Sequence, residues 1–195
     1  MLDRAARRRL DPLLERWAAR CIAFGLSADA VTMIGFGIGL VAMLFIAAGH
    51  DLIGLALLLL NRTADGIDGA VARRTRPTER GGYLDIVLDF ILYAGVPFAF
   101  AVGHPEHALA AAFLIFAFVG TGTSFLAFAI FKPDAPRLGK AFHYLGGLTE
   151  GTETIAFFAL VLLFPSTFAV AAWIFGALCW VTTLGRIGAA MSALR

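Results

Sequence analysis

The 195-residue sequence contains few charged residues and few cysteines. Asp, Glu, Lys and Arg make up only 15% of the chain, whereas 59% of the residues are hydrophobic. This composition excludes an ordinary soluble domain and indicates an integral membrane protein. The two cysteines, Cys21 and Cys179, do not have the spacing of metal ligands, so neither a structural disulfide nor thiol chemistry is expected.

Six apolar stretches divide the chain, each close to the ~20 residues that a membrane-crossing helix needs. They lie at about residues 28–48, 52–72, 82–102, 108–131, 145–164 and 167–190. The second stretch is the least apolar, because Asn61, Arg62 and two aspartates interrupt it. The sequence therefore predicts an all-α integral membrane protein with six transmembrane helices.

Lysine and arginine are absent from three links between these stretches, at residues 49–51, 103–106 and 165–166. They are frequent before the first stretch and in the two remaining links, and Arg195 ends the chain. Because basic loops stay on the cytoplasmic side of a membrane, we expect both termini and the two basic links to be cytoplasmic. In a bacterium this membrane would be the inner membrane.

Residues 1–26 have the pattern of an amphipathic helix and precede a membrane domain at residues 27–195. Apolar residues such as Leu13 and Trp17 recur at helical spacing opposite a series of arginines, and no short apolar core of a signal peptide follows them. Such a helix is expected to lie on the cytoplasmic membrane surface, with its arginines at anionic headgroups. The alternative is a helix that packs on the bundle.

Four aspartates interrupt the second and third apolar stretches: Asp65, Asp68, Asp85 and Asp89. Each carboxylate costs roughly 2.5–3.5 kcal/mol inside a membrane on insertion scales, and the four repel one another. Spacings of three and four residues place each pair on one face of its helix, so adjacent antiparallel helices would face them as two pairs near the cytoplasm. Such a group of oxygens predicts a site for Mg²⁺ or Mn²⁺.

Small residues flank these aspartates on both helices. They are Gly66, Gly69, Ala70, Ala72, Gly81 and Gly82. Glycine costs about 1 kcal/mol relative to alanine within a helix, so its repeated use requires a reason. The reason is either room for a ligand or close contact between membrane helices; beside the aspartates and Arg73, the pattern favours a nucleotide or phosphate site.

The run from Asp65 to Asp89 has the pattern D-x2-D-G-x2-A-R-x7-G-x3-D-x3-D. It resembles the signature of the CDP-alcohol phosphotransferases (CDP-alcohol phosphatidyltransferases), membrane enzymes of phospholipid synthesis. One departure is the stretch at residues 27–32, where Thr32 fits the family but its usual Pro and Asn are absent.

The resemblance implies a homodimer with six helices per subunit and a polar cavity that opens to the cytoplasm. Two divalent ions would bind the diphosphate of CDP-diacylglycerol, whose phosphatidyl group passes to a small alcohol with release of CMP. By the same resemblance, Asp65, Asp68 and Asp85 are metal ligands, and Asp89 is a ligand or the general base. The CDP site would be lined by Asp65, Gly69, Ala72, Arg73 and Gly81.

The acceptor alcohol is left open by the sequence. Lys132, Arg137, Lys140 and Arg186 could bind a phosphorylated acceptor, although positive-inside topology also explains the first three. Glu150 and Glu153 could line a pocket for an amine-bearing acceptor, or could simply complement the dipole at the start of a helix. These cations and acids favour opposite kinds of acceptor.

Three other interpretations compete with this one. The transfer could run from a soluble CDP-alcohol to a lipid acceptor. Intramembrane aspartates also mark ion or proton transporters, but here the acids gather near one face and no repeated half is present. A catalytically inactive scaffold would have lost positions of the pattern, and none is lost. Nucleic acid is not an expected partner.

Overall fold

A computed structural model describes residues 2–131 and 148–194, and every regular element in these ranges is helical. The helices are α1 (Leu2–Ala23), α2 (Ala28–Ala47), α3 (Asp51–Arg74), α4 (Glu79–Gly103), α5 (Ala108–Phe131), α6 (Gly151–Leu163) and α7 (Phe168–Ala193). Short 3₁₀ turns at Pro105–His107 and Pro165–Thr167 precede α5 and α7. The all-α prediction is confirmed over the described residues.

Five of the six predicted spans begin and end within three residues of a helix in the structure, and α5 has the predicted bounds. The span predicted at residues 145–164 is the exception, since residues 148–150 are not helical and α6 begins at Gly151. Glu150 and Glu153 form a capping box there. This local arrangement satisfies backbone donors that a helix start leaves free, so the helix begins later than hydrophobicity indicates.

Four described helical segments are long and apolar enough to cross a membrane: Ala28–Ala47, Glu79–Gly103, Pro105–Phe131 and Pro165–Ala193. The chain is thus a helical membrane protein. Two predicted spans do not meet this criterion by themselves. The α3 helix has 24 residues but carries the charged residues of the candidate site, and the described part of α6 has 13 residues. A count of six spans therefore stays a prediction.

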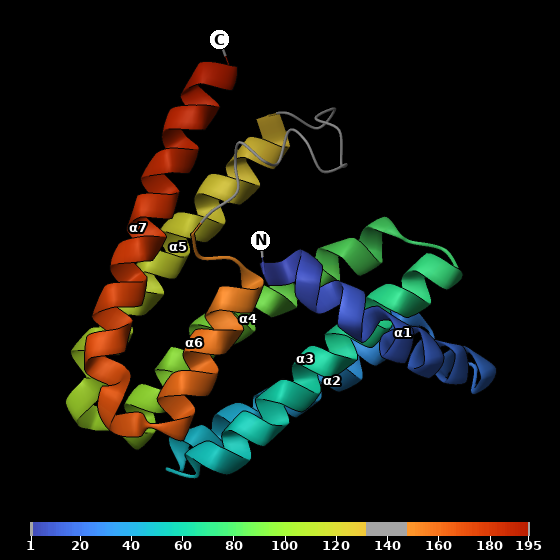
Figure 1. The fold of residues 1–195 in the computed structure, drawn as a ribbon, viewed down its shortest axis with the longest axis horizontal. Coiled ribbons are helices and arrows are strands. Elements are labelled where there is room, and N and C mark those ends of the chain that lie inside the picture. Colours follow the sequence, from blue (N-terminus) through green and yellow to red (C-terminus); the bar gives the residue numbers. More distant parts are fainter. Residues whose placement is uncertain (1, 132–147, 195) are drawn as a thin grey trace. The chain divides into compact units, whose positions relative to one another are not determined.

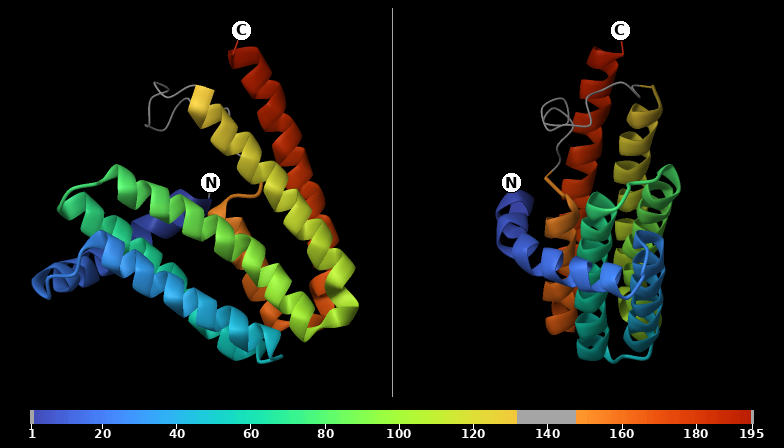
Figure 2. Two further views of the ribbon diagram at one scale, coloured as in Figure 1. Left: turned by 180° about the vertical axis from the view of Figure 1, so that it is seen from behind. Right: turned by 90° about the vertical axis from the view of Figure 1, so that its right-hand side faces the viewer.

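The chain forms two compact units, residues 1–104 and 105–195. In the first unit, α2 lies alongside both α3 and α4, and α1 packs against α3 (Figures 1 and 2). In the second unit, α5 and α7 lie side by side and α6 contacts α7. Aromatic rings pack in this second unit: Phe157 stacks on Phe175 in its core with centroids 4.7 Å apart, and Phe113 stacks on the partly exposed Trp173 at 4.3 Å.

Two buried glycines on α2 let the neighbouring helices approach closely. A Cβ atom at Gly35 would lie 2.9 Å from the Cβ of Ala64 on α3, and one at Gly39 would lie 2.6 Å from Leu92 Cδ2 on α4. Small residues at helix contacts are the usual means of close approach in membrane proteins. The two glycines are one turn apart, so α2 holds both helices that carry the aspartates.

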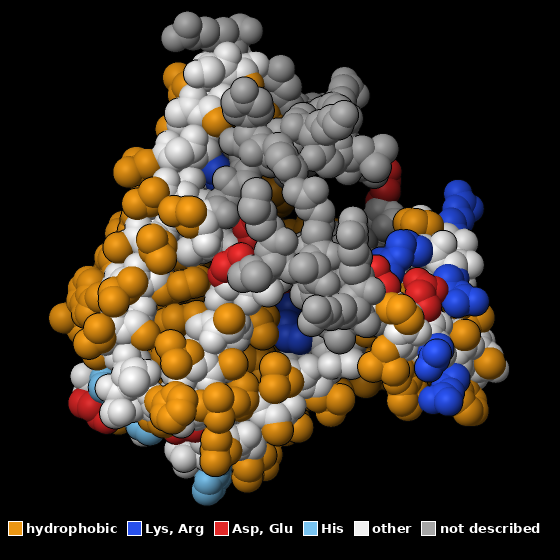
Figure 3. Space-filling model, viewed as in Figure 1, with side chains coloured by type: hydrophobic (Ala, Val, Ile, Leu, Met, Phe, Trp, Pro, Cys, Tyr) orange, Lys and Arg blue, Asp and Glu red, His pale blue; other side chains and the backbone are white. Residues whose placement is uncertain are grey.

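The apolar residues of α1 are of two kinds, some packed against α3 and others exposed. Ala18 packs against Ala70 and Val71 of α3, whereas Leu13 is 50% exposed and Trp17 is 45% exposed. Lys and Arg side chains gather at this end of the unit, over α1 and the α3–α4 loop (Figure 3). The expected helix is present, and one face does pack on the bundle; its position at a membrane surface stays a prediction.

We predict that Gly35→Ala destabilises the first unit, because the new methyl group meets the Cβ of Ala64, which has no flexible side chain that could move aside. Overpacking of this kind typically costs about 1–3 kcal/mol. The matched control is Gly37→Ala on the same helix, where a Cβ has no neighbour within 4 Å. Thermal unfolding in detergent should show a lower midpoint for Gly35→Ala alone; equal midpoints would contradict this account of the α2–α3 contact.

Candidate functional site

Three of the four aspartates meet between α3 and α4. Asp65 and Asp68 on α3 and Asp85 on α4 each offer a carboxylate oxygen, and these oxygens all lie within 4.8 Å of one another. The spacing of three residues puts the first two on one face of α3, and the antiparallel neighbour brings Asp85 to them. The predicted meeting of aspartates from two helices is therefore seen for these three.

Asp68 is the most buried of the three, with 6% exposure, and α2 contributes its partner. The hydroxyl of Thr32 lies 2.6 Å from Asp68 Oδ2 and 3.0 Å from the carbonyl oxygen of Ala28. A hydroxyl has a single proton to donate, and the shorter contact to the carboxylate has the length of a charge-assisted hydrogen bond. Thr32 thus orients one oxygen of Asp68.

The fourth aspartate, Asp89, is held by a cation that the sequence analysis did not single out. Arg62 Nη1 donates to Asp89 Oδ1 at 2.7 Å and lies 3.9 Å from Asp65 Oδ2. Its Nε donates to the Asn61 side chain at 2.8 Å, and the Asn61 amide donates to the Gly35 carbonyl at 2.8 Å. The signal in the sequence was a cation three residues before Asp65 inside an apolar stretch.

All four aspartates border one hollow in the first unit, with an empty volume of about 230 Å³ that includes open solvent. Its lining comes from α2, α3 and α4 and also includes Thr32, Gly35, Phe36, Asn61, Arg62, Leu88 and Leu92. Acids and their partners occupy one part of this wall and apolar side chains the rest. The hollow therefore combines a polar group of oxygens with an apolar wall that includes Phe36, Leu88 and Leu92.

The geometry and chemistry of the three carboxylates suit a hard divalent ion. Opposite ligands of an octahedral Mg²⁺ lie about 4.2 Å apart, because each metal–oxygen bond is about 2.1 Å long. Any two oxygens bound to one such ion lie no farther apart than this, and the three carboxylate oxygens, all within 4.8 Å of one another, come close to that limit. Carboxylate oxygen is the donor type that Mg²⁺ and Mn²⁺ prefer. Asp65, Asp68 and Asp85 could thus hold such an ion.

The small residues near the site have different surroundings. Gly66 and Ala70 support helix contact: a Cβ at Gly66 would lie 2.9 Å from Leu14 Cδ1 of α1, and Ala70 is fully buried against Ala18. At Gly69 a Cβ would meet only the Arg73 guanidinium, at 3.4 Å, and at Gly82 it would meet nothing within 4 Å. The sequence had favoured one explanation, a ligand site, for the whole group.

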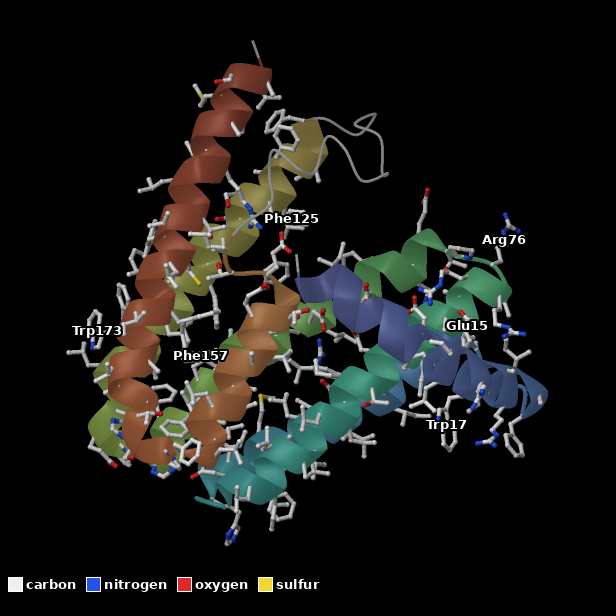
Figure 4. The ribbon with its side chains drawn as sticks, in the orientation of Figure 1. Glu15, Trp17, Arg76, Phe125, Phe157 and Trp173 are labelled. Atoms are coloured by element: carbon white, nitrogen blue, oxygen red, sulfur yellow. The ribbon has the colours of Figure 1, made fainter. Side chains whose placement is uncertain are left out.

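The remaining residues predicted for the CDP site lie where α3 ends and α4 begins. Gly81 donates its backbone N–H to Thr78 Oγ1, the N-cap of α4, at 3.0 Å. Ala72 is half-buried, and the exposed Arg73 forms an ion pair with Glu15 of α1 at 3.6 Å. Figure 4 shows Glu15 on α1 beside this end of α3. A Cβ at Gly81 would lie 3.1 Å from Asp29 Oδ1, so the first turn of α4 packs closely against the Asp29 side chain.

Of the residues suggested for the acceptor, Lys132, Arg137 and Lys140 lie outside the described residues. Glu150 and Glu153 are used locally, since the Glu153 carboxylate accepts the Glu150 backbone N–H at 3.3 Å in the capping box of α6. Their part in an acceptor site stays a prediction.

Arg186 of α7 faces its own unit. Its Nη1 donates to the Thr121 carbonyl of α5 at 3.0 Å, and its guanidinium carbon lies 5.7 Å from the centre of the Phe125 ring. Phe125 is labelled on α5 in Figure 4. These contacts leave its predicted part in binding an acceptor a prediction.

Comparisons with known proteins agree with the resemblance. The model of the CDP-alcohol phosphatidyltransferase family matches residues 26–185. The inner membrane protein YnjF of Escherichia coli (strain K12) is 51% identical over 193 residues, which cover 96% of this chain and 94% of that protein.

Two solved structures of Mycobacterium tuberculosis phosphatidylinositol phosphate synthase (PgsA1) share the fold. The structure with CDP-DAG bound has a TM-score of 0.68 at 21% identity and covers 92% of this chain and 94% of that one. The complex with manganese and citrate also has a TM-score of 0.68 at 21% identity, with coverages of 91% and 88%. Since the family model spans most of the sequence and includes all four aspartates, the chain belongs to the CDP-alcohol phosphatidyltransferase family.

Proposed function

We propose that this protein transfers the phosphatidyl group of CDP-diacylglycerol to the hydroxyl of a small alcohol and releases CMP. The observation that carries the proposal is the group of three carboxylates from Asp65, Asp68 and Asp85, with Asp89 on the wall of the same hollow, in a chain of this family. The fold neighbour with CDP-DAG bound supports CDP-diacylglycerol as the donor.

Asp65, Asp68 and Asp85 would hold the divalent ions, Mg²⁺ or Mn²⁺, two of them in the arrangement that the family suggests. The fold neighbour in complex with manganese supports this choice. When bound, such ions neutralise the diphosphate and stabilise the leaving CMP. The protein contributes the orientation of the ligands, and Thr32 does this for Asp68.

The donor would lie along the C-terminal end of α3 and the first turn of α4. Gly69 and Ala72 leave room beside α3, Arg73 offers a guanidinium for a phosphate oxygen, and Gly81 lets the backbone approach the nucleotide. Arg73 would then exchange its exposed partner Glu15 for the donor.

Asp89 would act as the general base. The acceptor oxygen attacks the β-phosphorus in line, its proton passes to the Asp89 carboxylate, and the bond to the CMP oxygen breaks. The Asp89 carboxylate is not one of the three whose oxygens all lie within 4.8 Å of one another, and it accepts a hydrogen bond from Arg62. One carboxylate oxygen is thereby positioned, while the other can accept a proton.

The acceptor would be a small alcohol, and its phosphate, if present, would require cations beyond those at the donor. Arg186 is the described candidate, beside Lys132, Arg137 and Lys140 of the fourth link. Six membrane spans, a homodimer, cytoplasmic termini and a site that opens to the cytoplasm complete the proposal. The membrane relative YnjF, named an inner membrane protein, supports the same membrane here.

We expect Asp89→Asn to lower kcat by about 10²–10⁴-fold, the usual contribution of a general base. The assay follows CMP release from radiolabelled CDP-diacylglycerol with Mn²⁺ and a panel of alcohols. The control is Glu106→Gln, a change of the same charge at an exposed 3₁₀ turn, which should leave turnover intact. Absence of CMP release from the wild type with every acceptor would contradict the proposed reaction, and an unchanged rate in Asp89→Asn would contradict the role of Asp89.

Thr32→Val should weaken Mn²⁺ binding by about 10–100-fold, the typical effect of losing a partner that orients a metal ligand. Valine keeps the shape of threonine but cannot donate to Asp68 Oδ2. Thr32→Ser keeps the hydroxyl and should retain most of the affinity. Isothermal titration of the purified protein with Mn²⁺ measures both; equal affinities for Thr32→Val and Thr32→Ser would show that this hydrogen bond does not support the site.

Reporter fusions should place both ends of the chain in the cytoplasm, because the basic links and termini lie on one side. Green fluorescent protein at the C-terminus should fluoresce, and alkaline phosphatase there should be inactive. Phosphatase inserted at residues 103–106 should be active. The reverse pattern would place the aspartates on the wrong side for a cytoplasmic CDP-linked donor.

A further inference from the structure

Arg62 is held from several directions at the centre of the first unit. Its guanidinium contacts Asp89 and Asp65 on one side and Asn61 on the other, and it lies 5.7 Å from the centre of the Tyr93 ring. Only 14% of its side chain is exposed. Ordering and desolvating a guanidinium costs free energy. The contacts of Arg62 with the aspartates must offset this cost.

The anchor of Arg62 reaches a third helix. Asn61 is 2% exposed and donates to the backbone carbonyl of Gly35 on α2. A Cβ at Gly39 would lie 3.2 Å from the Asn61 amide nitrogen, so both glycines of α2 border this anchor. The position of the guanidinium therefore depends on the same contacts by which α2 packs against α3 and α4.

The charge around Arg62 is strongly negative. Four aspartates line the hollow, and of the described Lys and Arg side chains only Arg62 forms an ion pair with any of them. Its Nη1 lies between Asp89, at 2.7 Å, and Asp65, at 3.9 Å. A guanidinium in this place reduces the repulsion among the carboxylates and also repels a divalent ion that approaches them.

We propose that Arg62 is a built-in counter-cation that competes with the divalent ions and holds Asp89 apart from the three-carboxylate group. This inference rests on the proposed metal site and extends it to a residue outside the aspartate pattern. Arg62 would stabilise the metal-free protein, keep Asp89 available as a base rather than as a further ligand, and weaken the affinity for the metal. It is a positioning residue, because it acts through Asp89 and Asp65.

The test compares Mn²⁺ binding by purified, full-length Arg62→Gln, Arg62→Lys and Arg74→Gln with that of the wild type. Glutamine removes the charge but keeps a hydrogen-bonding amide, whereas lysine keeps the charge and loses the Nε donor to Asn61. Arg74→Gln is matched in charge and lies on the same helix, where the exposed Arg74 forms an ion pair with Glu15. Free Mn²⁺ is followed by electron paramagnetic resonance, and thermal unfolding is recorded with and without Mn²⁺.

We expect Arg62→Gln to bind Mn²⁺ at least about tenfold more tightly, because a nearby positive charge has been removed. Its unfolding midpoint should fall without metal and return toward the wild-type value with Mn²⁺. Arg62→Lys and Arg74→Gln should bind Mn²⁺ within threefold of the wild type.

Two results would overturn the inference alone: wild-type or weaker Mn²⁺ binding by Arg62→Gln, or a loss of stability that is the same with and without Mn²⁺. Either would make Arg62 a structural residue while the wild type still binds metal. Absence of Mn²⁺ binding by the wild type is a different result, since it would overturn the metal site itself and the inference with it.

Discussion

The repulsion among four carboxylates inside an apolar helix bundle is the constraint on which the first unit depends. Each acid is costly in such surroundings, and together they could not remain close without compensation. The structure supplies two kinds of partner: the Thr32 hydroxyl for Asp68 and the Arg62 guanidinium for Asp89. Divalent ions would supply the rest. The protein compensates the negative charge of the four carboxylates only in part, and the remaining charge would favour binding of a metal ion.

The compensation is tied to the way the helices pack. Gly35 and Gly39 bring α2 close to its neighbours, and the Gly35 carbonyl then receives the Asn61 amide that anchors Arg62. A change in helix approach would move the guanidinium and with it Asp89. Small residues thus act on the site through helix contact.

In the second unit, polar residues of the membrane helices have local hydrogen-bond partners. Glu150 and Glu153 complete the first turn of α6, a task that their position in the sequence already explained. Arg186 instead spans from α7 to a backbone carbonyl of α5, which orders its guanidinium.

The sequence by itself determined the helices and the reaction family. Runs of apolar residues and their links placed five of the six predicted spans within three residues, because hydrophobic length and turn residues are local properties. The spacing from Asp65 to Asp89 identified the family for the same reason. Only the tertiary structure decided that Arg62 pairs with Asp89, and that Gly66 lies against Leu14 of α1 whereas Gly69 has only the Arg73 side chain beside it. Those outcomes depend on how each helix is rotated and how closely it approaches its neighbours, and residue spacing along one helix does not encode either quantity.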